Sequence, residues 1–157
     1  MSLSKPLSQR IILSFVSVCA VLSLASAAAA ADFVCTKKDN VNIRSRASSD
    51  APVAMEIFNG YPLKVEKKEG DWLKVSDYEN DGGWIHSSMV NKNTNVIVSA
   101  KKSAKMRMNP DPKSPVIADI DRGVVLTVVS TKGKWKQLKH SAGTVGWMED
   151  SNFWPQQ

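Results

Sequence analysis

The chain of 157 residues matches itself at a constant spacing of 63 residues. When residues 35–90 are placed over residues 98–153 without a gap, 13 of the 56 aligned positions are identical, whereas ordinary residue frequencies give about three by chance. The identical pairs include Trp72 with Trp135, Trp84 with Trp147 and Arg44 with Arg107. This period exceeds the roughly 20 to 50 residues of stacked repeats, so each copy is expected to be a small domain with its own core. Two such copies favour a binding module over an enzyme.

Apolar and polar residues alternate within each copy, as in Leu63-Lys64-Val65-Glu66, which is the period of a half-buried strand. Turn residues such as Asn59-Gly60 interrupt this alternation repeatedly. The pattern predicts six strands per copy, those of the second copy lying 63 residues after those of the first. In the first copy they are expected near 33–37, 41–44, 53–58, 62–68, 72–77 and 83–86. The polar residues 91–94 are the expected linker.

About 60 residues of short strands are too few for a two-sheet sandwich but sufficient for a tightly curled barrel. The sequence therefore predicts an all-β chain of two tandem small β-barrels, over residues 32–90 and 95–157. Because each core is nearly minimal, we expect the copies to contact one another, with the C-terminal Phe153-Trp154-Pro155 folding back.

Residues 1–31 predict a secretory signal peptide. Two basic residues precede an uncharged run of 21 residues that fades into alanine and serine. Cleavage is expected to leave a mature chain that begins between Ala28 and Asp32 and is periplasmic or secreted. The alternative is an uncleaved membrane anchor, because 21 uncharged residues are long enough to span a bilayer.

The formal charge of +6 is divided unevenly between the copies. Residues 32–90 contain 8 basic and 10 acidic side chains, whereas residues 91–157 contain 11 basic and 5 acidic ones. The second copy is therefore expected to attract polyanions such as acidic wall polymers, unless its scattered lysines serve only solubility. Nucleic acid is a poor candidate partner for an exported protein.

Signal cleavage leaves Cys35 as the only cysteine, so export provides no intramolecular disulfide and stability must come from packed cores. Cys35 follows Phe33 and Val34 in an expected strand. We interpret it as a small apolar core residue rather than a reactive or intermolecular thiol.

The first copy resembles the bacterial SH3-like (SH3b) domain in the order of several motifs. These are Val41-Asn42-Ile43-Arg44, Ala51-Pro52-Val53, Gly60, Leu63-Lys64-Val65, Gly70-Asp71-Trp72-Leu73-Lys74-Val75 and Gly83-Trp84-Ile85-His86. The second copy keeps much of the pattern but has Lys105 in place of Asn42 and Lys136 in place of Leu73. The resemblance implies two SH3-like β-barrels on an exported protein. Members of that family commonly accompany cell-wall hydrolases or stand alone outside the cytoplasm, and some recognise peptidoglycan peptides.

Catalysis is not expected, because nucleophilic chemistry needs an activated Cys or Ser beside an oriented base. His86 aligns with Glu149 and His140 with Asp77, so neither histidine belongs to a duplicated site. No cofactor is expected, and the scattered carboxylates and histidines lack the usual spacing of metal ligands. We interpret the acidic residues at 77, 79 and 81 as a solvated loop.

The aromatic residues carry the remaining signal. If Leu73 and Val75 fill the barrel, Trp72 projects toward its rim or outer face. The candidate ligand-binding residues are Arg44, Tyr61, Trp72, Tyr78 and Trp84 in the first copy and Arg107, Trp135 and Trp147 in the second. The tryptophans either form a shallow groove for a peptide or glycan or bury against loops, and the arginines either grip a ligand carboxylate or tie down their own loops.

These features together predict an exported, non-enzymatic pair of SH3-like barrels that binds a cell-envelope component, with wall peptide as the first choice. The alternative is an adaptor that docks another envelope protein through the groove between the copies and needs no wall affinity. No stable membrane insertion is expected after signal cleavage.

Overall fold

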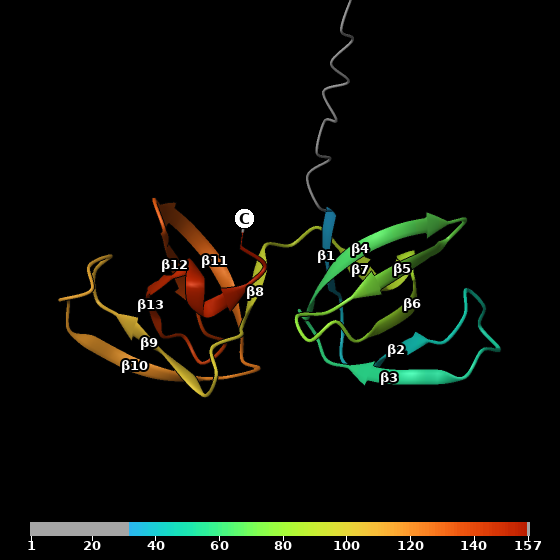
Figure 1. Ribbon diagram of the computed structural model, residues 1–157, viewed down its shortest axis with the longest axis horizontal. Coiled ribbons are helices and arrows are strands. Elements are labelled where there is room, and N and C mark those ends of the chain that lie inside the picture. Colours follow the sequence, from blue (N-terminus) through green and yellow to red (C-terminus); the bar gives the residue numbers. More distant parts are fainter. Residues whose placement is uncertain (1–31, 157) are drawn as a thin grey trace, which may run out of the picture.

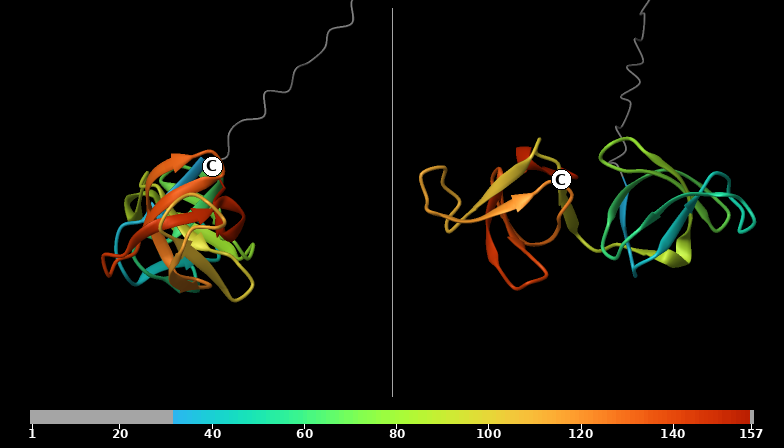
Figure 2. Two further views of the ribbon diagram at one scale, coloured as in Figure 1. Left: turned by 90° about the vertical axis from the view of Figure 1, so that its left-hand side faces the viewer. Right: turned by 90° about the horizontal axis from the view of Figure 1, so that it is seen from below.

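A computed structural model describes residues 32–156 of the protein, and the predicted signal peptide lies outside these residues. The described chain forms two all-β domains that lie side by side along the long axis of the molecule and are joined by a short linker (Figures 1 and 2). The predicted all-β fold, with one small unit per repeat, is confirmed.

Each domain is one seven-stranded antiparallel sheet that curls around its own core. The first domain contains β1 (Asp32–Thr36), β2 (Val41–Arg44), β3 (Val53–Ile57), β4 (Pro62–Glu69), β5 (Trp72–Ser76), β6 (Gly82–His86), the 3₁₀ helix η1 (Ser87–Met89) and β7 (Val90–Asn91). The second contains β8 (Asn95–Val98), β9 (Ser103–Arg107), β10 (Val116–Asp121), β11 (Val125–Lys132), β12 (Trp135–Lys139), β13 (Val145–Glu149), the 3₁₀ helix η2 (Asp150–Asn152) and β14 (Phe153–Trp154).

The strand order is the same in both sheets, β3-β2-β6-β5-β4-β1-β7 in the first and β10-β9-β13-β12-β11-β8-β14 in the second. All twelve predicted strands are present, with ends within two residues of the prediction. The short 3₁₀ helices and the two-residue strands β7 and β14 were not predicted, because two or three residues are too few to show a period. In each domain this last strand returns to pair with the first strand.

The alternation of the sequence corresponds to the observed burial. In β5, Leu73 and Val75 are buried in the core of the first domain while Lys74 between them is exposed. Gly83 allows β6 to approach β2 closely, because a Cβ atom at this position would lie 2.5 Å from the carbonyl oxygen of Arg44. Gly146 occupies the same place in the second domain. This requirement explains why both repeats have glycine before the second tryptophan.

The turn between β5 and β6 is organised by the buried carboxylate of Asp77. It accepts hydrogen bonds from the hydroxyl of Tyr61 (3.0 Å) and from the backbone N–H groups of Glu79 (2.9 Å) and Asp81 (3.0 Å). Burial, followed by the nearby Asp77 charge, raises the pKa of Tyr61, so the phenol stays protonated and donates. The interpretation of this acidic segment as a solvated loop was therefore wrong for Asp77. Its carboxylate is buried and accepts hydrogen bonds from protein groups in place of water.

The expected contact between the copies is present. Ile97 of β8 is fully buried in the apolar cluster that contains the core of the first domain. The ring of Trp154 packs edge-to-face on Phe33, with centroids 5.3 Å apart. A further contact joins the turn after β10 to the turn between β5 and β6. There the guanidinium of Arg122 donates to Glu79 (3.0 Å) and lies 4.9 Å from the ring centre of Tyr78. Apolar and ionic contacts thus join the two domains.

A matched pair of glycines tests this interface. Gly60 and Gly123 are equivalent in the repeat and both have positive φ, so alanine at either position costs about 1–2 kcal/mol in backbone strain. A Cβ atom at Gly60 would also lie 2.7 Å from Nδ2 of Asn95, which donates to the Gly60 carbonyl (2.8 Å), whereas the nearest atom to one at Gly123 is 3.9 Å away. We expect Gly60→Ala to lower the free energy of unfolding more than Gly123→Ala, as measured by urea denaturation. Equal losses, with the NMR signals of Asn95 unchanged, would contradict the contact.

Candidate binding sites

A depression of about 330 Å³ lies on the first domain, where β2, β5 and η1 meet. Its lining combines two cationic side chains, three apolar ones that include an indole, two amides, a hydroxyl and an imidazole. It is formed by Lys38, Asn40, Val41, Asn42, Arg44, Ser49, Trp72, His86 and Met89. We call it the first-domain depression. It brings together two of the predicted site residues, Arg44 and Trp72.

Local contacts hold the side chains of this depression in place. The ring of Trp72 stands edge-to-face against His86, with centroids 5.3 Å apart. Nδ1 of His86 in turn contacts the hydroxyl of Ser88 at 2.8 Å. One guanidinium nitrogen of Arg44 donates to the Ala51 carbonyl at 2.6 Å, which ties the arginine to the loop between β2 and β3. The indole and the guanidinium are therefore fixed before any ligand arrives.

The second domain carries an equivalent depression of about 250 Å³. Every one of its eight lining residues lies 63 positions after a residue that lines the first-domain depression. They are Ser103, Ala104, Lys105, Arg107, Pro112, Trp135, Glu149 and Asn152. Arg107 donates to the Ser114 carbonyl at 2.7 Å, as Arg44 does to Ala51. The duplication thus repeats a surface feature as well as a core.

The chemistry of the two depressions differs. Trp135 is only 7% exposed, whereas Trp72 is half-buried. Glu149 replaces His86 and forms an ion pair with Lys134 at 2.8 Å, which places a carboxylate in the second depression. The lysine that replaces Asn42, Lys105, is paired with Asp119 at 3.3 Å. The second depression is therefore smaller, it contains a carboxylate, and its Lys105 is already paired with Asp119.

The structure places the other predicted site residues elsewhere. Tyr61 is buried and bonded to Asp77, and Tyr78 lies at the domain interface against Arg122. Trp84 is half-buried beneath the ammonium of Lys67, which is 5.2 Å from the centre of its indole. Its repeat equivalent, Trp147, is half-buried in β13 opposite Arg107. None of these four residues lines either depression.

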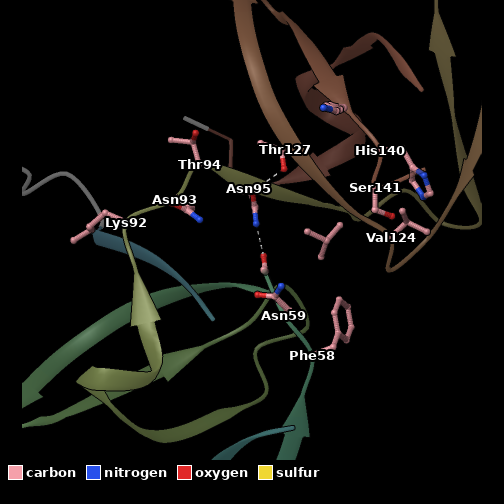
Figure 3. A pocket seen from close by; sticks show the side chains of 13 residues that line it. Phe58, Asn59, Lys92, Asn93, Thr94, Asn95, Val124, Thr127, His140 and Ser141 are labelled. Atoms are coloured by element: carbon pink, nitrogen blue, oxygen red, sulfur yellow. Dashed lines mark hydrogen bonds between the residues drawn. The ribbon is translucent and has the colours of Figure 1, made fainter. Parts of the chain in front are cut away.

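A second kind of site lies between the domains. A pocket of about 850 Å³ is lined by both domains and by the linker, and we call it the interdomain pocket (Figure 3). Phe58, Asn59 and Gly60 come from the first domain, Lys92–Asn95 from the linker and β8, and Val124, Val125, Thr127, Lys139, His140 and Ser141 from the second domain. The side chain of Asn95 bridges the domains here, because Nδ2 donates to the Gly60 carbonyl and Oδ1 contacts the hydroxyl of Thr127 at 3.2 Å.

Two groups that sequence reasoning considered for chemistry have structural roles. The thiol of Cys35 is buried and donates to the Asn93 carbonyl at 3.0 Å, and burial raises its pKa, which makes it a poor nucleophile. Nδ1 of His140 accepts from the backbone N–H of Ala142 at 3.0 Å, as Asp77 does for its own turn. Across residues 32–156 we find no cluster of three side chains arranged to hold a metal ion.

Sequence reasoning missed most of the polar lining of the first-domain depression, including Asn40, Asn42, Ser49 and His86. His86 was set aside because its repeat equivalent is Glu149, yet both residues occupy the same place in equivalent depressions. A signal was present, because a polar residue follows the Gly-Trp-aliphatic motif in both copies, His86 in the first and Glu149 in the second. The change from His86 to Glu149 at equivalent positions indicates that the two depressions differ in chemistry.

The chain belongs to the bacterial SH3 domain family. The family pattern matches residues 37–92 and again residues 100–155, which are the two repeats. The resemblance found in the motifs of the first copy is therefore confirmed, and it extends to the second copy despite Lys105 and Lys136.

Known proteins share this region at low identity. Over 120 residues the chain is 22% identical to the putative N-acetylmuramoyl-L-alanine amidase YrvJ of Bacillus subtilis (strain 168), a match that covers 70% of this chain but only 23% of that protein. The chain thus spans about a quarter of the length of this relative. Among solved structures it is similar to NlpC2 from Trichomonas vaginalis, with TM-score 0.36, 9% identity and coverage of 80% of this chain and 48% of that one. It is also similar to the endolysin LysPBC5 CBD, with TM-score 0.30, 17% identity and coverage of 77% and 90%.

Proposed function

We propose that this protein is a non-enzymatic binding module of the cell envelope, and that the depression of its first domain holds the peptide part of peptidoglycan. The family of both domains supports a binding role. The amidase relative is named for the N-acetylmuramoyl-L-alanine linkage, which joins sugar to peptide in that polymer. The region shared with this relative is about a quarter of that protein. We therefore infer the same polymer as ligand and do not infer the amidase reaction.

The observation that carries the proposal is the pairing of the fixed indole of Trp72 with the fixed guanidinium of Arg44, beside the ammonium of Lys38, in the first-domain depression. Wall peptides are short, rich in alanine and bear free carboxylates. Arg44 and Lys38 provide charge-assisted donors for a carboxylate, and no carboxylate is among the residues described as lining this depression. Trp72 and Met89 provide apolar contact for alanine methyl groups, while Asn40 and Asn42 suit peptide N–H and C=O groups.

The first domain is the better site for such a ligand. In the second domain Glu149 would repel a peptide carboxylate, and Trp135 has little surface left to offer. The net positive charge of residues 91–157 would instead act at longer range, by drawing the protein toward an acidic envelope. One domain would bind while its neighbour contributes attraction and stability.

A protein that binds peptidoglycan must lie outside the cytoplasm, and we propose this location. The predicted signal peptide supports this location. Among residues 32–156, no helix has the length and apolar character that crossing a membrane requires.

Substituting the two equivalent tryptophans tests the proposed site. The probe is the soluble wall tetrapeptide L-Ala-γ-D-Glu-diaminopimelate-D-Ala, titrated into the purified protein and followed by amide NMR. We expect Trp72→Ala to weaken binding at least about tenfold, because a central aromatic contact is lost, whereas Trp135→Ala leaves the affinity unchanged. Shifts around Trp135 instead of Trp72, or no saturable shifts at millimolar peptide, would contradict the proposal. The unperturbed spectrum of each variant shows whether it is folded.

One observation favours the alternative of a protein adaptor. The second domain exposes a group of large apolar side chains. These are Val116 (42% exposed) and Ile117 (40%) on β10, Val145 (40%) on β13 and Met108 (57%), which follows β9, the strand between β10 and β13 in the sheet. A surface of this kind is typical of protein contacts. If the tetrapeptide fails to bind and Ile117→Ser reduces capture of an envelope protein, the adaptor function is favoured over wall binding.

A further inference from the structure

We propose that the interdomain pocket is a second binding site, and that its ligand is a neutral glycan strand that bears acetamido groups. This proposal is independent of the peptide site, because the two sites share no residue. The pocket volume of about 850 Å³ lies within the range of about 300–1,000 Å³ that is usual for small-ligand sites.

The aromatic platform of this pocket is Phe58. Its side chain is 45% exposed, yet its ring is fixed by an edge-to-face contact with buried Tyr61, with centroids 5.3 Å apart. The fold does not require a phenylalanine here, because the equivalent residue in the second domain is Asp121. An ordered aromatic face beside polar groups suits the apolar face of a sugar ring. Phe58 thus has the geometry of a stacking residue and no structural counterpart in the repeat.

Most of the remaining lining consists of hydrogen-bonding groups. Asn59 and Asn93 bring side-chain amides, which match the acetamido group in both donor and acceptor capacity. His140 accepts from Ala142 through Nδ1, which leaves Nε2 as the nitrogen that can donate to a ligand. Lys139 at the end of β12 and Ser141 in the turn that follows add an ammonium and a hydroxyl. The described lining has no carboxylate, so donors predominate, as a ligand rich in carbonyl, hydroxyl and ring oxygens requires.

The pocket is preformed by contacts that cross the domain interface. Asn95 joins Gly60 to Thr127 within the pocket, and the Cys35 thiol holds the linker through the Asn93 carbonyl. The contacts of Arg122 with Glu79 and Tyr78 fix the domains to each other from another pair of loops. A ligand between the domains therefore need not order them, and this lowers the cost of binding. Phe58 and His140 approach the pocket from opposite domains (Figure 3).

The same lining argues against a folded protein as the occupant. Cores of protein interfaces are enriched in aromatic and apolar side chains, whereas here one phenylalanine and two valines accompany several amides, hydroxyls and lysines. A flexible chain of hydrogen-bonding rings fits this composition better. The exposed apolar group of the second domain includes no residue of the pocket.

The test uses chitotetraose, the tetramer of N-acetylglucosamine, as the glycan probe and cellotetraose as the probe without acetamido groups. Binding to the purified protein is measured by titration and mapped by amide NMR. We expect saturable shifts at residues 58–60, 93–95 and 140–141, and affinity for cellotetraose at least about fivefold lower. Phe58→Ala should weaken chitotetraose binding about fivefold to tenfold, whereas Asp121→Ala, the repeat equivalent, should not.

Each outcome separates this site from the peptide site. Trp72→Ala is expected to keep chitotetraose binding while it loses the wall tetrapeptide, and Phe58→Ala is expected to do the opposite. Absence of saturable chitotetraose binding, or shifts confined to the first-domain depression, would overturn the proposal and leave the peptide site intact. Equal affinity for cellotetraose would overturn the assignment of the acetamido group.

Discussion

Replacing Phe153 by alanine is expected to lower the free energy of unfolding of the second domain by about 3–5 kcal/mol. Phe153 has no exposed surface and is the largest fully buried side chain of the chain that the structure describes. It lies in the core cluster with Leu138 and Met148, and its backbone pairs with Val98 in β8. Removal of the ring leaves a cavity in a core of only about 60 residues, which has little other apolar area to compensate.

The exposed Phe58 provides the control of the same residue type. Because Phe58 is 45% exposed, Phe58→Ala should cost less than about 1 kcal/mol. The two domains are joined, so hydrogen exchange of β8–β14 amides is measured in addition to urea denaturation. Equal effects of the two substitutions would show that β14 is not part of the core of the second domain.

The second large effect is expected at Asp77. Asp77→Ala removes the common acceptor of three donors, the Tyr61 hydroxyl and the backbone N–H groups of Glu79 and Asp81. The Tyr61 donor is buried, so leaving it unsatisfied costs about 1–3 kcal/mol, and loss of each hydrogen bond from the two part-buried N–H groups costs about 0.5–1.5 kcal/mol more. We therefore expect a loss of about 3 kcal/mol or more in the free energy of unfolding of the first domain, measured by urea denaturation.

Two further variants separate the contributions at this turn. Asp77→Asn keeps an oxygen acceptor and should lose less than half as much, while Tyr61→Phe removes one hydrogen bond and should lose about 1 kcal/mol. A loss with Asp77→Ala no greater than that with Tyr61→Phe would contradict the role given to the carboxylate. The equivalent His140, which accepts one backbone N–H in its own turn, shows that the position requires an acceptor but not a particular side chain.

The repeat and the alternation of residues were sufficient to predict the fold. The spacing of tryptophans and glycines reflects close approach of strands, as at Gly83, and these constraints are the same in both copies. The burial of Leu73 and Val75 on one side of β5 follows directly from the two-residue period. What was missed, η1, η2, β7 and β14, is too short to produce any period.

The sites were less predictable because they depend on which loops meet in space. Arg44 and Trp72 share a depression only because β2 and β5 both border β6, a relation that the linear sequence does not show. The arginine also proved to be tied to the Ala51 carbonyl, which is one of the two roles considered for it. The interdomain pocket could not be predicted from the repeat, because Phe58 and His140 are at positions where the two copies have different residues.

The two proposed sites lie in different parts of the molecule and suit different ligands. The first-domain depression comes from surface that the duplication provided twice, and it offers cations and an indole for a peptide. The interdomain pocket exists only because two domains dock, and it offers amides and a phenyl ring for a glycan. Binding of two parts of one polymer at separate sites would raise the overall affinity beyond that of either site.

The most direct measurement of the central claim is cosedimentation of the purified protein with purified peptidoglycan at low salt. Wild-type protein and Trp135→Ala should pellet with the polymer, whereas Trp72→Ala, shown to be folded by its NMR spectrum, should pellet much less. If the wild-type protein stays in the supernatant, or if Trp72→Ala pellets as well as the wild type, the protein does not bind the wall through its first domain.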